Sequence, residues 1–211
     1  MSEILFAPFD TETGARTPEE GDLLTFYMAI MDKEFKILDE IDLKLKPDDR
    51  LPVAQQEALN VNGIDLKKHL EDPATVTYSE GRKLLEAFLK KHAKKVGRFN
   101  NLRPMGYNVP FDEGYTWHYL LPRAEWNKYF HYKRVDVMER VDGLKEAGWF
   151  PPELGSLGTV VEYLQIPKRN AHNAKEDTHM MIDVYKKWLE IMRAKKDGGT
   201  AQDLISLLEA E

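Results

Sequence analysis

The chain has 211 residues, of which 42% are hydrophobic, so it can bury one substantial core and needs no second domain. It contains no cysteine, which excludes disulfides, thiolate zinc sites and a cysteine nucleophile and fits a reducing compartment. The formal net charge of -6 argues against a protein that coats DNA through many basic residues. It does not exclude an enzyme that needs only local positive charge.

No targeting or membrane segment is visible in the sequence. The first residues, 1–6, lack the basic segment and the long apolar run of a secretory signal. No stretch approaches the roughly 20 apolar residues that span a membrane. We therefore expect a cytoplasmic protein with no membrane partner.

The first 46 residues have the pattern of three strands. Apolar residues run over 4–9 and 23–31, and apolar and polar residues alternate from 37 to 45. Gly14 and the segment 18–22 supply the first turn. A three-stranded meander is therefore expected.

Helical spacing replaces this pattern between Pro52 and Lys95. A short helix that contains residues 54–59 is expected to end at Asn62-Gly63, since no pair of strands flanks that dipeptide. A longer helix begins near Ser79-Glu80. Its apolar face is predicted to consist of Leu84, Leu85, Phe88 and Leu89.

After Phe99, short strands alternate with helices. Strands are expected before Gly106 and at 135–137, and helices at 110–121, 137–147, 157–164 and 174–193. A meander followed by this alternation predicts the α/β class, with a mixed sheet flanked by helices. Residues 1–196 are predicted to form one domain. Residues 197–211 are predicted to form a flexible joint at Gly198-Gly199 and a short C-terminal helix.

Three separated segments carry the acids and the histidine that point to chemistry. They read F-D-T-E-T-G at 9–14, G-Y-N-V-P-F-D at 106–112 and H-N-A-K-E-D at 172–177. Asp10 and Glu12 lie two apart at a strand end, so both side chains face the same side. Asp112 stands at a predicted helix start. His172 lies in a loop, and Asp177 lies near the first turn of the next helix.

Four carboxylates brought together repel one another unless divalent cations neutralise them. Carboxylate and water ligands suit Mg²⁺ or Mn²⁺ rather than zinc. Two such ions activate a water, hold a scissile phosphate and stabilise the leaving oxygen. A histidine is a natural general base, because it titrates near neutral pH. The sequence therefore predicts a metal-dependent enzyme of phosphate chemistry.

Each of these residues alone has an ordinary structural explanation. Acids are common at turns and in the first turn of a helix, and a loop histidine is more often hydrogen-bonded than catalytic. Together they favour a functional site.

Other features favour structural roles. His179 beside His172 suggests zinc, but no third ligand stands at a suitable spacing. A helix dipole explains the basic cluster Lys90, Lys91, Lys94, Lys95 and Arg98. Trp117, Tyr119 and Trp126 are interpreted as core or rim residues. Phe111 or Tyr115 is a candidate contact for a terminal base.

The three segments resemble the three motifs of the DEDDh family of 3′-to-5′ exonucleases, which includes the proofreading epsilon subunit of DNA polymerase III, ribonuclease T and oligoribonuclease. The motif D-x-E matches Asp10 and Glu12. The motif N-x-x-F-D matches Asn108, Phe111 and Asp112, and H-x-A-x-x-D matches His172, Ala174 and Asp177. The order agrees with the family, and the resemblance covers residues 4–191.

The resemblance implies a ribonuclease H-like fold and the release of nucleoside monophosphates from a 3′ end. It implies that Asp10 binds both metal ions, that Glu12 and Asp177 hold the ion that activates water, and that Asp112 supports the second ion. His172 would take the proton of the water. The expected substrate contacts are Thr11, Thr13, Asn108, Phe111, Lys168 and Arg169.

Two positions depart from the family pattern, and the first of them leaves the substrate preference open. Thr13 alone separates Glu12 from Gly14, where many members have two residues, and Tyr107 replaces a common histidine. We expect a single-stranded or frayed 3′ end, of DNA in the leading interpretation. The alternatives are an RNA-directed exoribonuclease of the ribonuclease T or oligoribonuclease type and a non-catalytic nucleic-acid-binding module. A homodimer and a polymerase or replication partner also remain open.

Overall fold

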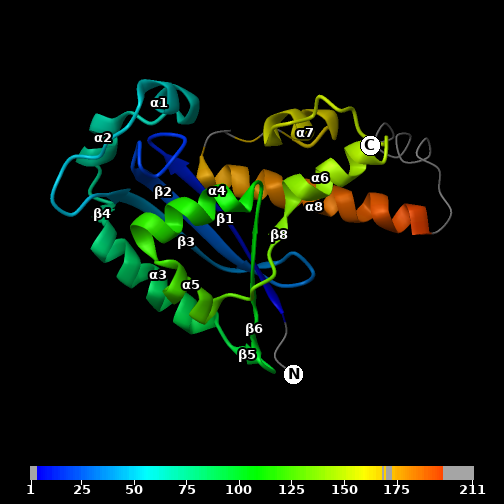
Figure 1. The fold of residues 1–211 in the computed structure, drawn as a ribbon, viewed down its shortest axis with the longest axis horizontal. Coiled ribbons are helices and arrows are strands. Elements are labelled where there is room, and N and C mark those ends of the chain that lie inside the picture. The colour runs from blue at the N-terminus through cyan, green and yellow to red at the C-terminus, as the bar shows by residue number, and fades with distance from the viewer. Residues whose placement is uncertain (1–3, 168, 170–172, 197–211) are drawn as a thin grey trace.

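The computed structural model of the chain describes residues 4–167, 169 and 173–196. The predictions for Lys168, His172 and the C-terminal segment 197–211 lie outside these residues. A six-stranded sheet forms the centre, in the order β4-β3-β2-β1-β7-β8 (Figure 1). Its strands are β1 Leu5–Thr13, β2 Leu23–Met31, β3 Ile37–Lys46, β4 Thr75–Thr77, β7 Leu102–Gly106 and β8 Val135–Asp136.

The meander predicted from the sequence is confirmed. β1 pairs antiparallel with β2, and β2 pairs antiparallel with β3. The three later strands β4, β7 and β8 pair parallel with β3, β1 and β7, so the sheet is mixed. β1 extends to Thr13, beyond the predicted strand 4–9, so Asp10 and Glu12 lie within the strand and pair with β2.

The helices are α1 Gln56–Asn62, α2 Leu66–Glu71, α3 Tyr78–His92, α4 Val109–Tyr115, α5 Arg123–Tyr129, α6 Val137–Glu146, α7 Leu157–Tyr163 and α8 Ala174–Lys196. A π-helical turn, Thr116–Leu120, continues α4 across the rest of the predicted helix 110–121. β5 Lys95–Val96 and β6 Phe99–Asn100 form a separate hairpin. Six helices were predicted near these bounds, whereas α2, α5, β4 and the hairpin were not.

Two apolar layers cover the two faces of the sheet. α6, α7 and α8 enclose one core with Met31 and Met105, and α3, α4 and α5 enclose the other with Phe9 and Phe26. Ala7 and Phe9 of β1 belong to the second core, and Phe6 packs on the first. Because side chains alternate along a strand, Asp10 and Glu12 face the α8 side.

α3 differs from its predicted apolar face at one position. Leu84 is 47% exposed, because the side that packs on the sheet consists of Gly81, Leu85 and Leu89. A Cβ at Gly81 would lie 2.6 Å from Leu45 Cδ2, so the glycine allows close packing. α1 ends as predicted, at Gly63 in the left-handed conformation with φ 67°.

None of the helices in the described part of the chain combines the length and apolar character needed to cross a membrane.

Candidate metal centre and adjoining pocket

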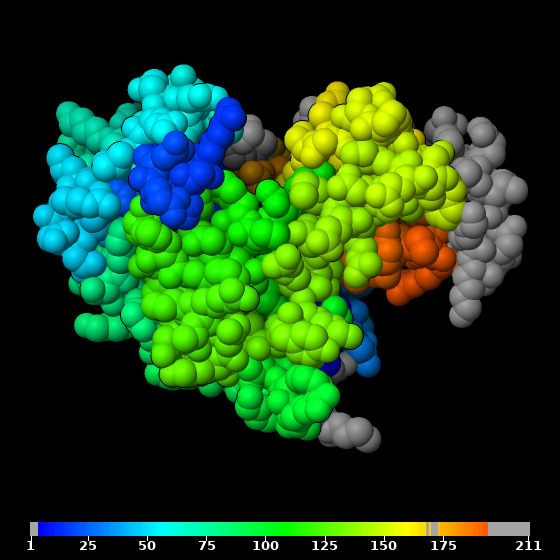
Figure 2. All heavy atoms as spheres, viewed as in Figure 1, coloured from blue at the N-terminus to red at the C-terminus, as the bar shows by residue number. Residues whose placement is uncertain are grey.

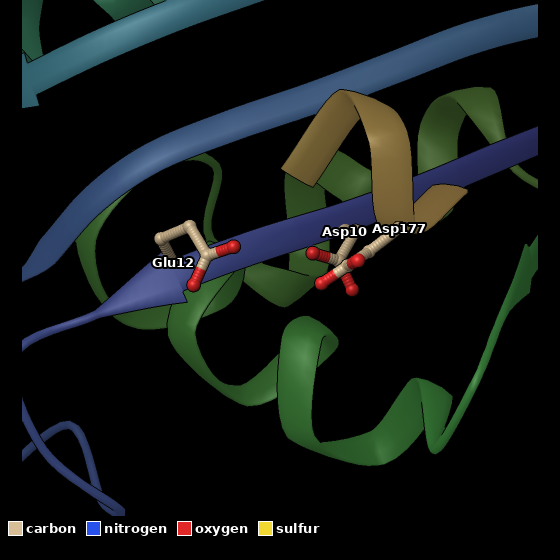
Figure 3. Close-up of side chains that lie close together, drawn as sticks. All are labelled: Asp10, Glu12 and Asp177. Carbon is tan, nitrogen blue, oxygen red and sulfur yellow. The ribbon is translucent and has the colours of Figure 1, made fainter. Parts of the chain in front are cut away.

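Three carboxylates meet where β1 passes the start of α8. Asp10 and Glu12 project from β1, and Asp177 projects from the first turn of α8. One oxygen from each carboxylate lies within 4.8 Å of the other two. Figure 3 shows Asp177 beside Asp10, with Glu12 farther along the strand. Segments more than 160 residues apart in sequence therefore form one acidic group, called the acidic centre below.

The fourth predicted acid, Asp112, lies beside the acidic centre on α4. It is buried, and its Oδ1 accepts hydrogen bonds from the backbone N–H of Thr11 at 3.0 Å and from Thr11 Oγ1 at 2.7 Å. Thr11 points to the opposite face of β1 from Asp10. The strand thus positions two acids directly and a third through the intervening threonine.

The negative charges of these acids repel one another. Burial, followed by the charges of Asp112, Glu12 and Asp177, raises the pKa of Asp10 well above its ordinary value. Burial, followed by the charges of Asp177 and Asp112, raises the pKa of Glu12 to about 8. Burial raises the pKa of Asp112 to about 7, although the hydrogen bonds from Thr11 act in the opposite direction.

The acidic centre has the properties of a site for divalent cations. Its donors are carboxylate oxygens, which are the ligands that hard divalent cations prefer. Without a cation, burial and the neighbouring charges raise the pKa values of Asp10 and Glu12 and so favour their protonated forms. A bound cation would replace those protons and stabilise the charged form.

Asp136 is a supporting residue that the sequence analysis missed. Its buried carboxylate accepts hydrogen bonds from the backbone N–H groups of Asn108, at 3.0 Å, and Val109, at 2.8 Å. Asn108 adopts the left-handed conformation with φ 66°, immediately before α4. Asp136 therefore fixes the start of the helix that carries Asp112. The only sequence signal for it was an acid at the end of a short strand.

The residues near the start of α8 show how the basic side chains are used. Arg169 pairs with Asp183 at 3.3 Å and with Glu176 at 3.8 Å, both on α8. Its expected contact with a substrate phosphate remains a prediction. The ring of His179 packs 6.1 Å from that of Tyr27, and burial lowers the pKa of His179. His179 thus lies against β2.

A cavity of about 280 Å³ adjoins Glu12. It is lined by Thr11, Glu12, Thr13, Ala15, Arg16, Gln55, Glu57, Ala58, Val61, Asn62 and Phe111. Phe111 and Val61 give it apolar walls, and Asn62 Nδ2 donates to the carbonyl of Thr13 at 3.1 Å, which ties α1 to β1. The cavity therefore combines an apolar wall with a carboxylate of the acidic centre.

Of the two aromatic residues considered as base contacts, only Phe111 lines this cavity. Tyr115 is fully buried, and its hydroxyl donates to the carbonyl of Ala15 at 2.6 Å. The hydroxyl of Thr13 donates to the same carbonyl at 2.8 Å. Tyr115 therefore supports the turn behind the cavity, and a direct contact between Tyr115 and a base is excluded in this conformation.

An ion pair between the buried Asp22 and the more exposed Arg50 anchors the other wall of the cavity. The fully buried carboxylate of Asp22 accepts bonds from Arg50 Nη1 at 2.5 Å, Arg50 Nη2 at 2.7 Å and the N–H of Val53 at 2.6 Å. The backbone of Gly14 joins the two segments, because its N–H donates to the carbonyl of Asp22 and its carbonyl accepts from the N–H of Gln55. Asp22 thus holds the segment that leads into α1.

We expect Asp22→Asn to destabilise the fold by about 2 kcal/mol, because a charge-assisted pair is lost and Arg50 is left half-buried. Burial raises the pKa of Asp22, but the bonds from Arg50 and Val53 and the charge of Arg50 lower it below its ordinary value. The stabilisation is thus present above the unfolded pKa, near 4, and is lost as the pH falls through the lower folded value. Urea unfolding of both proteins from pH 6 to about pH 3 measures this.

The difference in unfolding free energy between wild type and Asp22→Asn should shrink as the pH falls. Asp49→Asn, which changes an exposed acid next to Arg50, is the matched control and should have little effect. A constant difference at every pH would show that the carboxylate of Asp22 stabilises nothing by its charge.

Comparison with known proteins identifies the fold. No family model matches the chain, and no curated protein matches its sequence. Solved structures do match, and they confirm the predicted ribonuclease H-like class, a mixed sheet flanked by helices. All of those described next are structures of bacterial exonuclease I.

The zinc-bound form of the complex of E. coli exonuclease I with single-stranded DNA matches with a TM-score of 0.67 and 22% identity, over 96% of this chain and 42% of that chain. The E. coli enzyme with a dT13 oligonucleotide gives 0.68 and 21%, over 92% and 42%. Exonuclease I from Methylocaldum szegediense gives 0.66 and 22%, over 92% and 41%. This chain therefore spans less than half the length of those proteins, with which it shares the fold.

Proposed function

We propose that this chain is a metal-dependent 3′-to-5′ exonuclease of the DEDDh type, which releases nucleoside monophosphates from single-stranded or frayed 3′ ends. The observation that carries the proposal is the convergence of Asp10, Glu12 and Asp177, with Asp112 beside them. These acids come from three motifs that lie far apart in the sequence. The shared fold with exonuclease I, solved with single-stranded DNA, favours DNA as the substrate.

The acidic centre and Asp112 would hold two divalent ions, Mg²⁺ or Mn²⁺. When bound, such ions supply activation of a water and stabilisation of the charge on the leaving oxygen. Asp10 would contact both, Glu12 and Asp177 the one nearer the attacking water, and Asp112 the other. Thr11 and Asp136 act indirectly, because their hydrogen bonds fix the carboxylate of Asp112 and the start of α4.

His172 would act as the general base that removes a proton from the attacking water. It lies five residues before Asp177 in the sequence. This role follows from the resemblance of the third motif. Lys168 and Arg169, in the same segment, are the proposed contacts for a substrate phosphate.

The cavity beside Glu12 would receive the terminal nucleoside. Phe111 and Val61 offer apolar surface to a base, and Thr11, Thr13 and the neighbouring Asn108 would contact the sugar and phosphate. Because α1 closes one side of this cavity, the end of a nucleic-acid strand fits it more readily than the middle of one. The acidic centre at its edge would then meet the last phosphodiester.

The polarity of cleavage tests this proposal. A 5′-labelled DNA strand incubated with Mg²⁺ or Mn²⁺ should shorten as a ladder of products, and a 3′ phosphate should slow the reaction. A matched RNA strand measures the alternative substrate. The Asp177→Asn variant, prepared identically, is the control for a contaminating nuclease. Release of the 5′ label in the first products, or cuts in a closed circle, would contradict a 3′ exonuclease.

A further inference from the structure

Two segments concentrate positive charge within this acidic chain. Residues 93–103 contain four Lys or Arg and no acid, and residues 122–134 contain four Lys or Arg and one acid, Glu125. The two segments therefore carry a formal charge of +7 in a chain whose total is -6. They fold against each other, because the carbonyl of Leu102 accepts from the N–H of His131 and Asn100 Nδ2 donates to the carbonyl of Phe130.

Three rings from these segments form a cluster where the segments meet, in which His131 and Tyr132 stack and Phe99 is tilted against both. The ring centroids of Phe99 and His131 are 5.1 Å apart, those of Phe99 and Tyr132 5.3 Å, and those of His131 and Tyr132 4.7 Å. Tyr132 is 69% exposed. An aromatic surface therefore remains open to a planar ligand.

Cations border the stacked rings. Arg98 lies over Phe99 at 4.8 Å, Lys133 lies 5.8 Å from the centre of the Tyr132 ring, and Arg123 lies over Trp117 at 5.0 Å. None of these three cations has a carboxylate within 4.0 Å among the described residues. Many other cations do, such as Lys91 with Asp39 at 2.6 Å. The charges of Arg98 and Lys133 are therefore left for a ligand, whereas the charge of Arg123 also acts on Glu113, which lines the adjoining cavity with it.

A cavity of about 310 Å³ adjoins the stack, and Trp117, Arg123, His131, Tyr132 and Arg134 contribute to its lining. The Nε1 group of Trp117 is buried and has no hydrogen-bond partner within the described part of the chain. An unpaired buried donor is costly unless a ligand or water satisfies it. We call the surface formed by Arg98, Phe99, Arg123, His131, Tyr132 and Lys133 the basic aromatic patch.

The basic aromatic patch is distinct from the acidic centre. β5 and β6 lie at the lower end of the molecule in Figure 1, and α1, which walls the cavity beside Glu12, lies at the upper end. Leu5, at the start of β1, pairs with Leu102, and Asp10 lies five residues farther along β1, about 17 Å at the strand rise. In Figure 2 the hairpin and α5 lie on the lower part of the face shown.

We propose that the basic aromatic patch binds single-stranded nucleic acid, at a distance from the strand end that the acidic centre holds. Exposed rings stack bases without regard to sequence, and unpaired cations neutralise phosphates. An acidic peptide would use the cations but not the stacked rings, so the combination favours a nucleic acid. The inference rests on the proposed function in that the bound strand is the substrate.

Fluorescence anisotropy tests the patch without hydrolysis. A labelled oligothymidylate of about 16 nucleotides is titrated with the protein in excess chelator. The variant Arg98→Ala/Lys133→Ala should bind about tenfold more weakly, and the magnitude of its salt slope should fall by about 1.4, or 0.7 for each lost phosphate contact. Tyr132→Ala should also bind about tenfold more weakly. Lys67→Ala/Lys68→Ala, two exposed lysines of α2, is the control and should bind as wild type does.

An abasic strand of equal length separates stacking from charge. It should bind wild type more weakly than oligothymidylate, and this difference should be smaller for Tyr132→Ala. Unchanged affinity in the patch variants, an equal loss in the α2 control, or equal binding of the two strands by wild type would overturn the proposal. Hydrolysis of an oligonucleotide of about 4 nucleotides with Mg²⁺ tests the acidic centre separately. If this oligonucleotide is not hydrolysed, the proposed function is contradicted, while the binding result for the patch stands.

Discussion

Replacement of Asp10 by alanine is expected to lower the rate of nucleotide release by at least about 10³-fold, because the loss of metal-bound charge stabilisation costs several kcal/mol of barrier. Burial and the charges of Asp112, Glu12 and Asp177 raise the pKa of Asp10. We therefore expect it to contribute to both metal sites, so calorimetric titration with Mn²⁺ should also show weaker binding. Single-turnover kinetics at saturating Mn²⁺ measures the loss of rate.

The same position allows a check that the variant is folded. The raised pKa means that the charged carboxylate of Asp10 destabilises the metal-free fold near neutral pH. Asp10→Asn should therefore unfold at a higher temperature than wild type in excess chelator, while it is inactive with Mg²⁺. Asp49→Ala, an exposed acid, should change neither property. Near-normal turnover of Asp10→Ala would refute the assignment of this residue.

His172→Ala is expected to lower turnover by about 10² to 10⁴-fold and to leave the affinity for Mn²⁺ almost unchanged. The reason is the division of roles: four carboxylates hold the ions, and the histidine only accepts a proton. Calorimetry gives the metal affinity, and single-turnover kinetics at saturating metal gives the rate of chemistry.

His118→Ala, which removes an exposed histidine from the π-helical turn, is the matched control for His172. It should retain full turnover. A large loss of metal affinity in His172→Ala, with chemistry intact at saturating metal, would make His172 a ligand and the proposed general base wrong.

The parts of the fold that followed from the sequence are those with a strong local period. β2 is almost wholly buried and appears as a continuous apolar run, and β3 alternates because one side faces solvent. α8 and α3 are long enough for helical spacing to be unambiguous. α2 and α5, with six and seven residues, are too short for a period to stand out. The equally short α1 was found from its end at Asn62-Gly63.

The acids of the candidate site were predictable because each lies in a motif with a distinctive frame. The residues that hold them were not. Asp22 and Asp136 are buried acids in a loop and at a strand end, and acids at such positions are usually exposed. Arg50 lies 28 residues from Asp22 in the sequence, and Val109, at the start of α4, lies 27 residues from Asp136. Only the folded chain shows that these long-range bonds exist.

The basic cluster at the end of α3 illustrates a second limit. Lys90 and Lys91 pair with Glu86 and Asp39, so these two do not form a free cationic surface. Arg98, in the same sequence cluster, instead stacks on Phe99 and joins a surface with residues after α5. The sequence could not show which of these cations are paired and which are free, because the pairing depends on which acids the sheet and helices bring near.

Removal and restoration of the metal is the measurement that tests the central claim most directly. The purified protein is treated with excess chelator and given a 5′-labelled single strand, and Mg²⁺ or Mn²⁺ is then added in excess. The account predicts an intact strand before the addition and a ladder of shortened products after it. Shortening at the full rate in excess chelator, or an intact strand with every divalent ion tried, would contradict it.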